Sequence, residues 1–322
     1  MSKFTSFLSV QIEFFIAFRK ASGRWSDTSY GTYLLLFDRY CKSNYPDATA
    51  LSQEMVDEWC AKRETETNNS CRSRIYAVVS LIRFLRKRGE TAVFEPHIPK
   101  KEKSLYIPHA FSDEELDRFF LACDSIPDTP TTFEQRTRKI TIPVFFRLLY
   151  SSGIRTTEAR MLKVDNVDLE SGVIDIEYSK GHAQHFIVLH DLMLELMRTY
   201  DKAIEKLCPN RSYFFPARCD KFHTASWVSV NFKELWGQYN RSHAVAYALR
   251  HHYAVCNINQ WIDEGFDFDD MLLYLSKSMG HVVLESTKYY YSLTPAIAQI
   301  LEEKTNHDFE WIVPEVYHDE DI

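Results

Sequence analysis

The sequence has no apolar run long enough to span a membrane, and its N-terminal apolar segment contains Glu13 and lacks a small-residue cleavage site. Neither a signal peptide nor a membrane partner is therefore expected. The seven cysteines are odd in number and show no tight pairing, which is typical of reduced thiols in a cytosolic compartment. We therefore expect a cytoplasmic globular protein, and 322 residues are enough for two domains with cores of their own.

The sequence also lacks acidic residues clustered at metal-ligand spacing, so two-metal nuclease chemistry has little support. Cys208, Cys219 and His223 could be taken for part of a zinc site, but their spacing matches no standard zinc finger and a structural role is favoured. No internal repeat or low-complexity segment is present. We predict that the protein needs neither a metal nor another cofactor.

Positive charge is not in excess, since the chain has a net charge of −7 at pH 7. This charge comes from residues 301–322, which hold eight acidic side chains and one lysine, so residues 1–300 are neutral overall. Binding of nucleic acid depends on where positive charge gathers and not on the total. The acidic balance therefore does not exclude a DNA-binding protein.

Basic side chains do gather in two neighbouring segments. They are Arg72, Arg74, Arg83, Arg86, Lys87 and Arg88 in the first segment and Lys100, Lys101 and Lys103 in the second. Such clusters are typical of phosphate contacts, although a solvated helix face can have the same composition. We interpret all nine as candidate DNA-binding residues, with double-stranded DNA as the partner.

Residues 1–95 show helical hydrophobic periodicity in four places. Helices are expected over about 5–21, after Thr28, from Ser52 to about Arg63, and around the apolar face between Ile75 and Leu85. The fourth helix carries its arginines mostly off that face, which suits a helix that packs on a core and faces phosphate. Three prolines surround the lysines that follow, so residues 96–109 are predicted to be an interdomain linker.

Residues 110–292 predict a second domain of mixed character. Ser112 and Glu115 form a capping-box pattern, and Gly153 is expected to end an apolar helix of about 140–150 so that Arg155 emerges at a turn. Alternating residues in 172–178 and 185–189 predict a β-hairpin with Lys180 in its turn. Further helices are expected over about 158–162, 192–206, 225–238, 244–261, 269–278 and 284–291. The predicted fold class is mainly α with a small antiparallel β-hairpin or sheet.

Four motifs in this second domain point to phosphate chemistry. A Gly-His pair ends at His281, nine residues before Tyr290, which suggests an imidazole that binds phosphate beside a phenol nucleophile. Upstream lie Arg155 and Glu158 in SSGIRTTE, Lys180 in YSKGHAQHFIVL, and Arg250 in YALRHHYAV. Four signals in one order are much harder to obtain by chance than any one of them.

This order resembles the catalytic domain of the tyrosine recombinase (phage integrase) family over roughly residues 110–300. The resemblance implies that Arg155 is the first arginine, Glu158 its acidic partner, Lys180 the hairpin lysine, Arg250 the second arginine, His281 the histidine and Tyr290 the nucleophile. It also implies that residues 1–95 are the helical core-binding domain. One position departs from the pattern, because Tyr247 stands three residues before Arg250 where the family usually has histidine. A phenol donates a hydrogen bond but carries no positive charge.

The same side chains define a reaction. Two arginines neutralise the phosphodiester oxygens with bidentate contacts, and His281 adds a donor. The resemblance gives Lys180 the role of general acid for the 5'-oxygen leaving group, and Tyr290 then holds the DNA as a 3'-phosphotyrosine. We expect a site-specific recombinase or integrase of a mobile element, working as a tetramer on paired sites in the nucleoid.

Two other interpretations remain open. A type IB topoisomerase or hairpin-forming resolvase would use the same chemistry, and Tyr247 leaves room for a catalytically weakened relative that binds and bridges DNA. Residues 293–322 form an acidic tail whose apolar positions lie at roughly helical spacing. This tail is predicted either to dock on a neighbouring protomer or to pack on its own domain.

Overall fold

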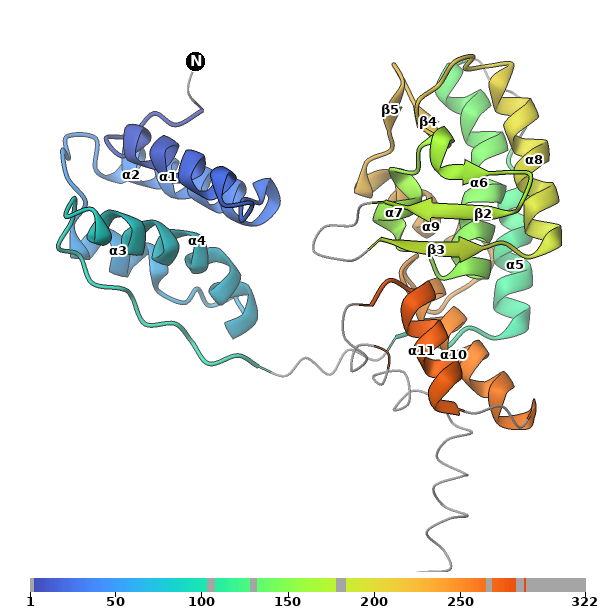
Figure 1. Cartoon of the computed structure of the whole chain (residues 1–322). Coiled ribbons are helices and arrows are strands. Elements are labelled where there is room, and N and C mark those ends of the chain that lie inside the picture. Colours follow the sequence, from blue (N-terminus) through green and yellow to red (C-terminus); the bar gives the residue numbers. More distant parts are fainter. Residues whose placement is uncertain are drawn as a thin grey trace, which may run out of the picture. The chain divides into compact units, whose positions relative to one another are not determined.

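The computed structural model describes residues 3–102, 108–127, 132–177, 184–264, 268–281 and 287, without the side chains of Thr28 and of 261–269. The chain divides into two compact units, residues 1–105 (unit 1) and 106–322 (unit 2), which Figure 1 colours from blue to teal and from teal to red. The division falls inside the segment that the sequence predicts to be a linker. The fold is mainly α with small antiparallel sheets, as predicted.

Unit 1 is helical throughout the part that the structure describes. Its elements are α1 (Ser9–Ala21), η1 (Asp27–Gly31, a π-helical turn), α2 (Thr32–Asn44), α3 (Gln53–Cys60) and α4 (Asn68–Lys87). The hydroxyls of Ser52 and Thr67 accept backbone N–H groups of the first turns of α3 and α4, which explains why these helices begin where they do. The third helix ends at Cys60, three residues earlier than predicted.

One apolar cluster holds unit 1 together. Ile12 of α1, Phe37 of α2, Val56 of α3 and Val78 of α4 are all fully buried in it. Each helix therefore turns one apolar stripe inward, as the helical spacing of these residues predicts.

Part of the chain that follows α4 returns to this helix and is hydrogen-bonded to its first turns. Arg72 donates to the carbonyl of Pro99 at 2.6 Å, and Asn69 and Glu102 exchange two hydrogen bonds of 2.8 and 3.1 Å through the Asn69 side chain and the Glu102 backbone. The Glu102 carboxylate also accepts the backbone N–H of Asn68, at the N-terminal end of α4 where a negative charge is favoured. Residues 96–102, here called the pinned segment, are thus ordered against α4.

Unit 2 combines helices with two short antiparallel sheets. In chain order its elements are α5 (Asp113–Asp124), α6 (Phe133–Ser152), α7 (Thr156–Arg160), η2 (Val164–Asn166, a 3-10 turn), β1 (Val167–Asp168), β2 (Val173–Ile176), β3 (His185–Val188), α8 (Asp191–Glu205), β4 (Pro216–Ala217), β5 (Lys221–Phe222), α9 (Ala225–Tyr239), α10 (Ala248–Glu264) and α11 (Phe268–Ser278). The predicted β2–β3 hairpin is confirmed, and β1 adds a third strand to it that the sequence does not reveal.

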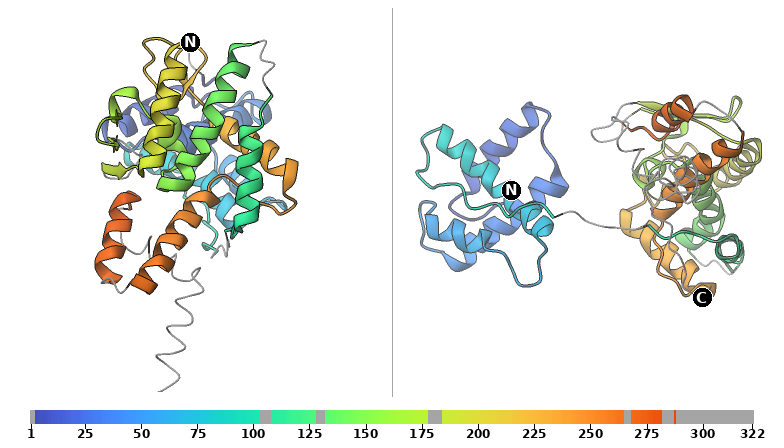
Figure 2. Two further views of the ribbon diagram at one scale, coloured as in Figure 1. Left: turned by 90° about the vertical axis from the view of Figure 1, so that its right-hand side faces the viewer. Right: turned by 90° about the horizontal axis from the view of Figure 1, so that it is seen from below.

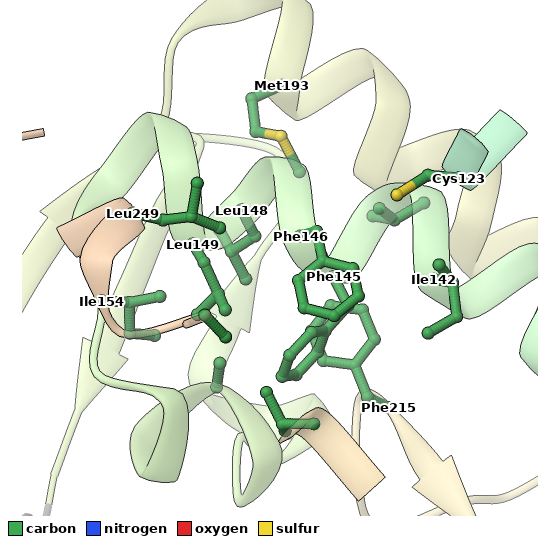
Figure 3. Packing of buried hydrophobic residues seen from close by; sticks show 14 of the residues in the cluster. Cys123, Ile142, Phe145, Phe146, Leu148, Leu149, Ile154, Met193, Phe215 and Leu249 are labelled. Carbon is green, nitrogen blue, oxygen red and sulfur yellow. The ribbon is translucent and has the colours of Figure 1, made fainter. Parts of the chain in front are cut away.

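Helix α6 lies at the centre of unit 2, where it packs against α5, α8 and α10. Figure 3 shows its aromatic pair Phe145 and Phe146 in the core, close to Phe215 from the segment after α8, with Leu249 of α10 at the edge of the same cluster. The helix is longer than the predicted 140–150 because Thr132 and Gln135 form a second capping box at its start. The helix contains Pro143 in its interior, although proline is better tolerated in the first turn of a helix.

The last two described helices of unit 2 pack against each other, and one of them also packs against the three-stranded sheet. Helix α10 packs against α6 and α11, and α11 packs against β3, so that α10 and α11 appear together in orange in the left view of Figure 2. The helix predicted over 284–291 lies outside the described residues, apart from Thr287. This arrangement brings the ends of α6, α10 and α11 to one place.

Candidate active site

The turn after α6 places the first arginine. Gly153 ends the helix with φ +62°, a left-handed conformation that glycine adopts without strain, and a Cβ at this position would lie 2.3 Å from the ring of Tyr253 on α10. Glycine is thus required twice here, for the turn and for the close approach of α10. The chain then continues through Ile154 to Arg155, the N-cap of α7, as predicted.

Arg250 of α10 is the most deeply buried of the predicted site residues that the structure describes, with 2% of its surface exposed. Its Nη1 donates to the carbonyl of Gly153 at 2.5 Å and its Nη2 to the carbonyl of Met279 at 2.6 Å. Nη2 also lies 3.1 Å from Nε2 of His281. The guanidinium therefore joins the turn after α6 to the turn after α11.

Arg155 reaches the same turn from the other side. Its Nη2 donates to the carbonyl of Gly280 at 2.8 Å, and its Nη1 donates to Glu158 Oε1 at 2.6 Å. The backbone N–H of Arg155 donates to the second oxygen of Glu158 at 3.0 Å. Glu158 thus orients Arg155, and the two arginines donate to the consecutive carbonyls of Met279 and Gly280.

His281 is the next residue in the chain, and both of its ring nitrogens have hydrogen-bond partners. A guanidinium only donates hydrogen bonds, so its contact with Nε2 requires this nitrogen to act as an acceptor. Nδ1 then carries the proton and donates to Oγ1 of Thr287 at 2.7 Å. Thr287 is fully buried and was not predicted as a site residue, since an isolated threonine in the sequence carries no signal of this contact.

Tyr247 lies at the start of α10 with 43% of its surface exposed. Its carbonyl accepts the N–H of Arg250 at 3.2 Å, and its ring meets that of His251 edge to face with centroids 5.1 Å apart. Burial, and then the charge of Arg250, lowers the pKa of His251 to about 4, so this imidazole is neutral near pH 7. Tyr247 also lines a cavity of about 600 Å³ between α9 and residues 240–247.

A polar cluster that the sequence did not reveal supports the loop before Tyr247. Glu115, the capping-box residue of α5, accepts the hydroxyl of Ser242 and contacts Nε2 of His109 at 2.8 Å. The carbonyl of Glu115 accepts the side-chain N–H of Asn240 at 3.1 Å. The loop that leads to Arg250 is therefore anchored to the start of unit 2, through residues more than a hundred positions apart.

Several predicted site residues lie outside the described residues. They are Lys180 and Tyr290 of the predicted catalytic set and Lys103 of the basic set. Among the predicted catalytic residues that the structure describes, Arg155, Glu158, Arg250 and His281 lie together. Tyr247 precedes Arg250 by three residues. The strands on either side of the segment that contains Lys180 pair through Ile176 and His185.

The basic residues of unit 1 differ in their surroundings. Arg83 forms a two-point contact with Glu95 at 2.7 and 2.8 Å, and Arg88 pairs with Glu90. Arg86 lies over the ring of Phe94. The side chains of Lys87, Lys100 and Lys101 are exposed.

Arg74 corrects the prediction for this set. It is 3% exposed, its Nε and Nη2 donate to the two oxygens of Glu66 at 2.6 and 2.7 Å, and it also donates to the carbonyls of Trp59 and Ala61. A side chain enclosed in this way cannot meet phosphate without breaking unit 1, so the prediction that Arg74 binds DNA is wrong. Arg74 instead joins the end of α3 to α4.

None of the described helices is both long and apolar enough to cross a membrane. Among the described residues, no three His, Cys, Asp or Glu side chains gather where they could hold a metal ion, and Cys208, Cys219 and His223 do not form such a group. Instead, His223 stacks on Trp227 with centroids 3.8 Å apart, and its carbonyl accepts a hydrogen bond from Arg160.

Comparison with known proteins agrees with this fold. The model of the phage integrase family matches residues 111–296. The tyrosine recombinase XerA of Thermococcus kodakarensis is 26% identical over 243 residues, which are 74% of this chain and 76% of that protein. The structure of the XerH recombinase bound to a palindromic difH substrate superposes with a TM-score of 0.58 and 17% identity, covering 89% of this chain and 80% of the other. A lambda integrase tetramer bound to a Holliday junction superposes with a TM-score of 0.57 and 13% identity, covering 88% of this chain and 76% of the other.

The match to the family model covers more than half of the sequence, so the chain belongs to the phage integrase family of tyrosine recombinases. Members of this family are site-specific recombinases. The chain is accordingly a DNA strand transferase of the tyrosine type.

Proposed function

We propose that this recombinase cuts and rejoins DNA through a 3'-phosphotyrosine formed on Tyr290, and that it serves a mobile element. The observation that carries this proposal is the convergence of Arg155, Arg250 and His281 on the Met279–Gly280 turn. Two guanidinium groups held by one turn, with an imidazole beside them, suit a phosphate, whose oxygens need positive charge and hydrogen bonds from several directions.

The proposed reaction assigns one task to each side chain. Tyr290 releases its phenolic proton to solvent, and its oxygen attacks phosphorus and forms the phosphotyrosine bond while the bond from phosphorus to the 5'-oxygen breaks. Lys180 donates the proton that the departing 5'-oxygen takes up. Arg155 and Arg250 stabilise the charge on the non-bridging oxygens. His281 adds a further hydrogen bond when its Nε2 takes up a proton and turns from Arg250 to the phosphate. Attack by the 5'-hydroxyl of a second strand reverses the step and frees Tyr290.

The two units divide the work in this proposal. Residues 1–95 form the core-binding domain, residues 110–292 the catalytic domain, and the 293–322 tail docks on a neighbouring protomer. The comparisons support a DNA-bound assembly, because the XerH and lambda integrase structures hold DNA and the latter is a tetramer. We therefore infer a tetramer on paired sites in the bacterial or archaeal nucleoid.

The DNA-contacting surface of unit 1 follows from the exposure of its basic residues. We include the predicted set without Arg74, namely Arg72, Arg83, Arg86, Lys87, Arg88, Lys100, Lys101 and Lys103. The exposed side chains in this set can meet phosphate without unfolding, and such contacts would fix position on the duplex without reading sequence.

The test is covalent capture on a library of nicked duplexes with randomised half-sites, so that the target sequence is selected by the protein itself. Wild-type protein is expected to select substrates that yield a protein–DNA adduct resistant to denaturing gel electrophoresis. Tyr290→Phe should abolish the adduct and leave half-site binding within a few-fold, because only the nucleophilic oxygen is lost. Tyr289→Phe and Tyr291→Phe are the matched controls. Loss of the adduct in one of them alone would show that this tyrosine, and not Tyr290, is the nucleophile.

A second candidate function is DNA binding and bridging without cleavage, which the uncharged and exposed Tyr247 favours. Binding without an adduct in the wild type would support it. In that case Tyr247→His, which supplies an imidazole able to carry charge near pH 6.5, would restore adduct formation. If the wild type already forms the adduct, the bridging function is excluded as the protein's only activity.

A further inference from the structure

A buried histidine lies behind the arginines, at the point where three parts of the site meet. His185 is the first residue of β3 and is 6% exposed. Its Nε2 lies 3.9 Å from Oε2 of Glu158, whose side chain is 2% exposed. This separation is longer than a direct hydrogen bond but short enough for a buried imidazole to act on the carboxylate electrostatically.

The same ring lies against Gly280. This glycine has φ +62°, and a Cβ on it would lie 2.5 Å from Cε1 and 2.6 Å from Nδ1 of His185. Distances below 3 Å do not occur between real atoms of this kind, so the absence of a side chain at residue 280 makes room for the imidazole. The carbonyl of this residue is the acceptor of Arg155 Nη2.

His185 thus lies beside both partners of Arg155. Glu158 holds Nη1 of Arg155, Gly280 holds Nη2, and the imidazole lies beside each of them. The guanidinium plane is fixed by these two hydrogen bonds, since two points on a rigid fork determine its orientation. Any shift of the imidazole would be transmitted to the guanidinium through its two acceptors.

The position of His185 in the sheet adds a link to the hairpin. His185 pairs with Ile176 at the end of the β2–β3 ladder, and residues 177–184 connect the two. That connection contains Lys180, the proposed general acid. Helix α11, which leads to Gly280 and His281, packs against the same strand. One residue therefore lies where the hairpin, the acidic partner and the Gly-His turn come together.

We propose that His185 is a positioning residue for DNA cleavage, which sets the orientation of Arg155 through Glu158 and Gly280 and ties it to the hairpin that carries Lys180. The inference rests on the proposed cleavage function. Histidine suits this place because its flat ring fits against a glycine while a ring nitrogen faces a buried carboxylate, which an apolar ring would leave poorly solvated.

The first test compares cleavage rate with binding and stability. At saturating DNA, His185→Ala is expected to slow adduct formation about 10-fold or more, because a small misplacement of a charge-stabilising group costs up to about 10²-fold. Half-site affinity should stay within about 3-fold. His185→Gln, which keeps a polar group toward Glu158, should recover part of the rate, whereas His185→Phe should not. The matched control is His223→Ala, which removes another buried histidine of unit 2 and should lower Tm but not the rate.

The second test asks whether His185 acts through Arg155. In an Arg155→Ala background, His185→Ala should slow adduct formation by less than about 2-fold further, while its effect on Tm should persist. A residue that merely supports the fold would lower the rate by the same factor in both backgrounds, and that result would overturn the proposal.

The third test uses the contact with Gly280. Gly280→Ala should reduce adduct formation severely, and adding His185→Ala should recover part of the loss by vacating the space that the new Cβ needs. Gly172→Ala is the control, because Gly172 has φ +75° and its Cβ would meet Leu194 instead. Its effect should combine with His185→Ala additively. Additive behaviour of the Gly280 pair as well would contradict the proposed contact.

Failure of the cleavage function and failure of the role of His185 give different results in these assays. If wild-type protein forms no adduct on any substrate of the library, the proposed cleavage function fails. If the wild type forms the adduct and folded His185→Ala and His185→Gln form it at the same rate, only the role of His185 fails. Tm measured for each variant shows which of them are folded.

Discussion

Two arginines, one in each unit, are buried to nearly the same extent and held by similar acceptors. Arg74 in unit 1 is 3% exposed and Arg250 in unit 2 is 2% exposed, and each donates to two backbone carbonyls. They differ in the third partner. Arg74 meets the carboxylate of Glu66 through two hydrogen bonds, whereas Arg250 meets the imidazole of His281.

This difference separates the structural role of Arg74 from the candidate catalytic role of Arg250. A carboxylate neutralises the guanidinium and lets it serve as a buried cross-link between helices. A carbonyl or a neutral imidazole fixes the direction of the N–H groups and leaves the positive charge intact, as a site for phosphate requires. Burial alone therefore does not separate the roles of Arg74 and Arg250, and a carboxylate partner does not decide the role by itself, since Arg155 also pairs with Glu158.

The largest effect is expected at Arg250. Arg250→Ala should slow adduct formation about 10²-fold or more in single-turnover assays, because a charge that stabilises the phosphorane is lost. Arg250→Lys should recover little, since one ammonium cannot replace a planar fork that reaches two carbonyls at once. A fully active Arg250→Lys would contradict this interpretation of Arg250, because positive charge alone, without the planar guanidinium, would then be sufficient for adduct formation.

Arg74 should show the opposite pattern. Arg74→Ala leaves Glu66, whose side chain is 14% exposed, without its partner and is expected to lower the free energy of unfolding of unit 1 by about 3 kcal/mol in denaturant titrations. The folded variant should form the adduct at a rate close to wild type. A large loss of DNA affinity with unchanged stability would restore Arg74 to the DNA-contacting set.

The Arg74–Glu66 pair also predicts a pH dependence of stability. The hydrogen bonds from Arg74 hold the pKa of Glu66 at about 2, below its ordinary value of 4.5. A depressed pKa in the folded state gives stability that is full above pH 4.5 and is lost as the pH falls through about 2. The difference in unfolding free energy between wild type and Glu66→Gln should therefore shrink between pH 5 and pH 2, as followed by urea titrations. A constant difference would show that the pair is not ionic.

The smallest effect is expected at Arg83, which is paired with Glu95 on the surface of unit 1. Arg83→Ala should change the free energy of unfolding by less than about 1 kcal/mol, since exposed pairs contribute little. Its proposed phosphate contact should appear instead as a decrease of about 1 in the slope of log affinity against log salt, equal for specific and random DNA. An unchanged slope would remove Arg83 from the DNA-contacting set.

Much of the fold could be predicted because local rules decide it. The capping box of Ser112 and Glu115, the end of α6 at Gly153 and the β2–β3 hairpin depend on residues close together in the sequence. The burial of Arg74 also had a local signal, because it falls at helical spacing between the buried Cys71 and Val78.

The rest depends on partners that are distant in the sequence. Glu115 meets Ser242 across 127 positions, and Arg155 meets Gly280 across 125. His185 lies at a strand end and carries no motif of its own. Such pairs arise from the packing of α5, α9, α10 and α11, which periodicity does not determine. The motifs therefore identified the candidate catalytic arginines, Glu158 and His281, but not the other residues that hold the arginines in place.

The pinned segment of unit 1 bears on the entropy of DNA binding. Ordering the backbone of one residue costs about 1–2 kcal/mol, and a flexible basic linker would incur this cost when it meets the duplex. Here Asn69 and Arg72 already hold the backbone on either side of Lys100 and Lys101. The backbone here is ordered when unit 1 folds, so the proposed contact of these two lysines with phosphate would carry little conformational penalty.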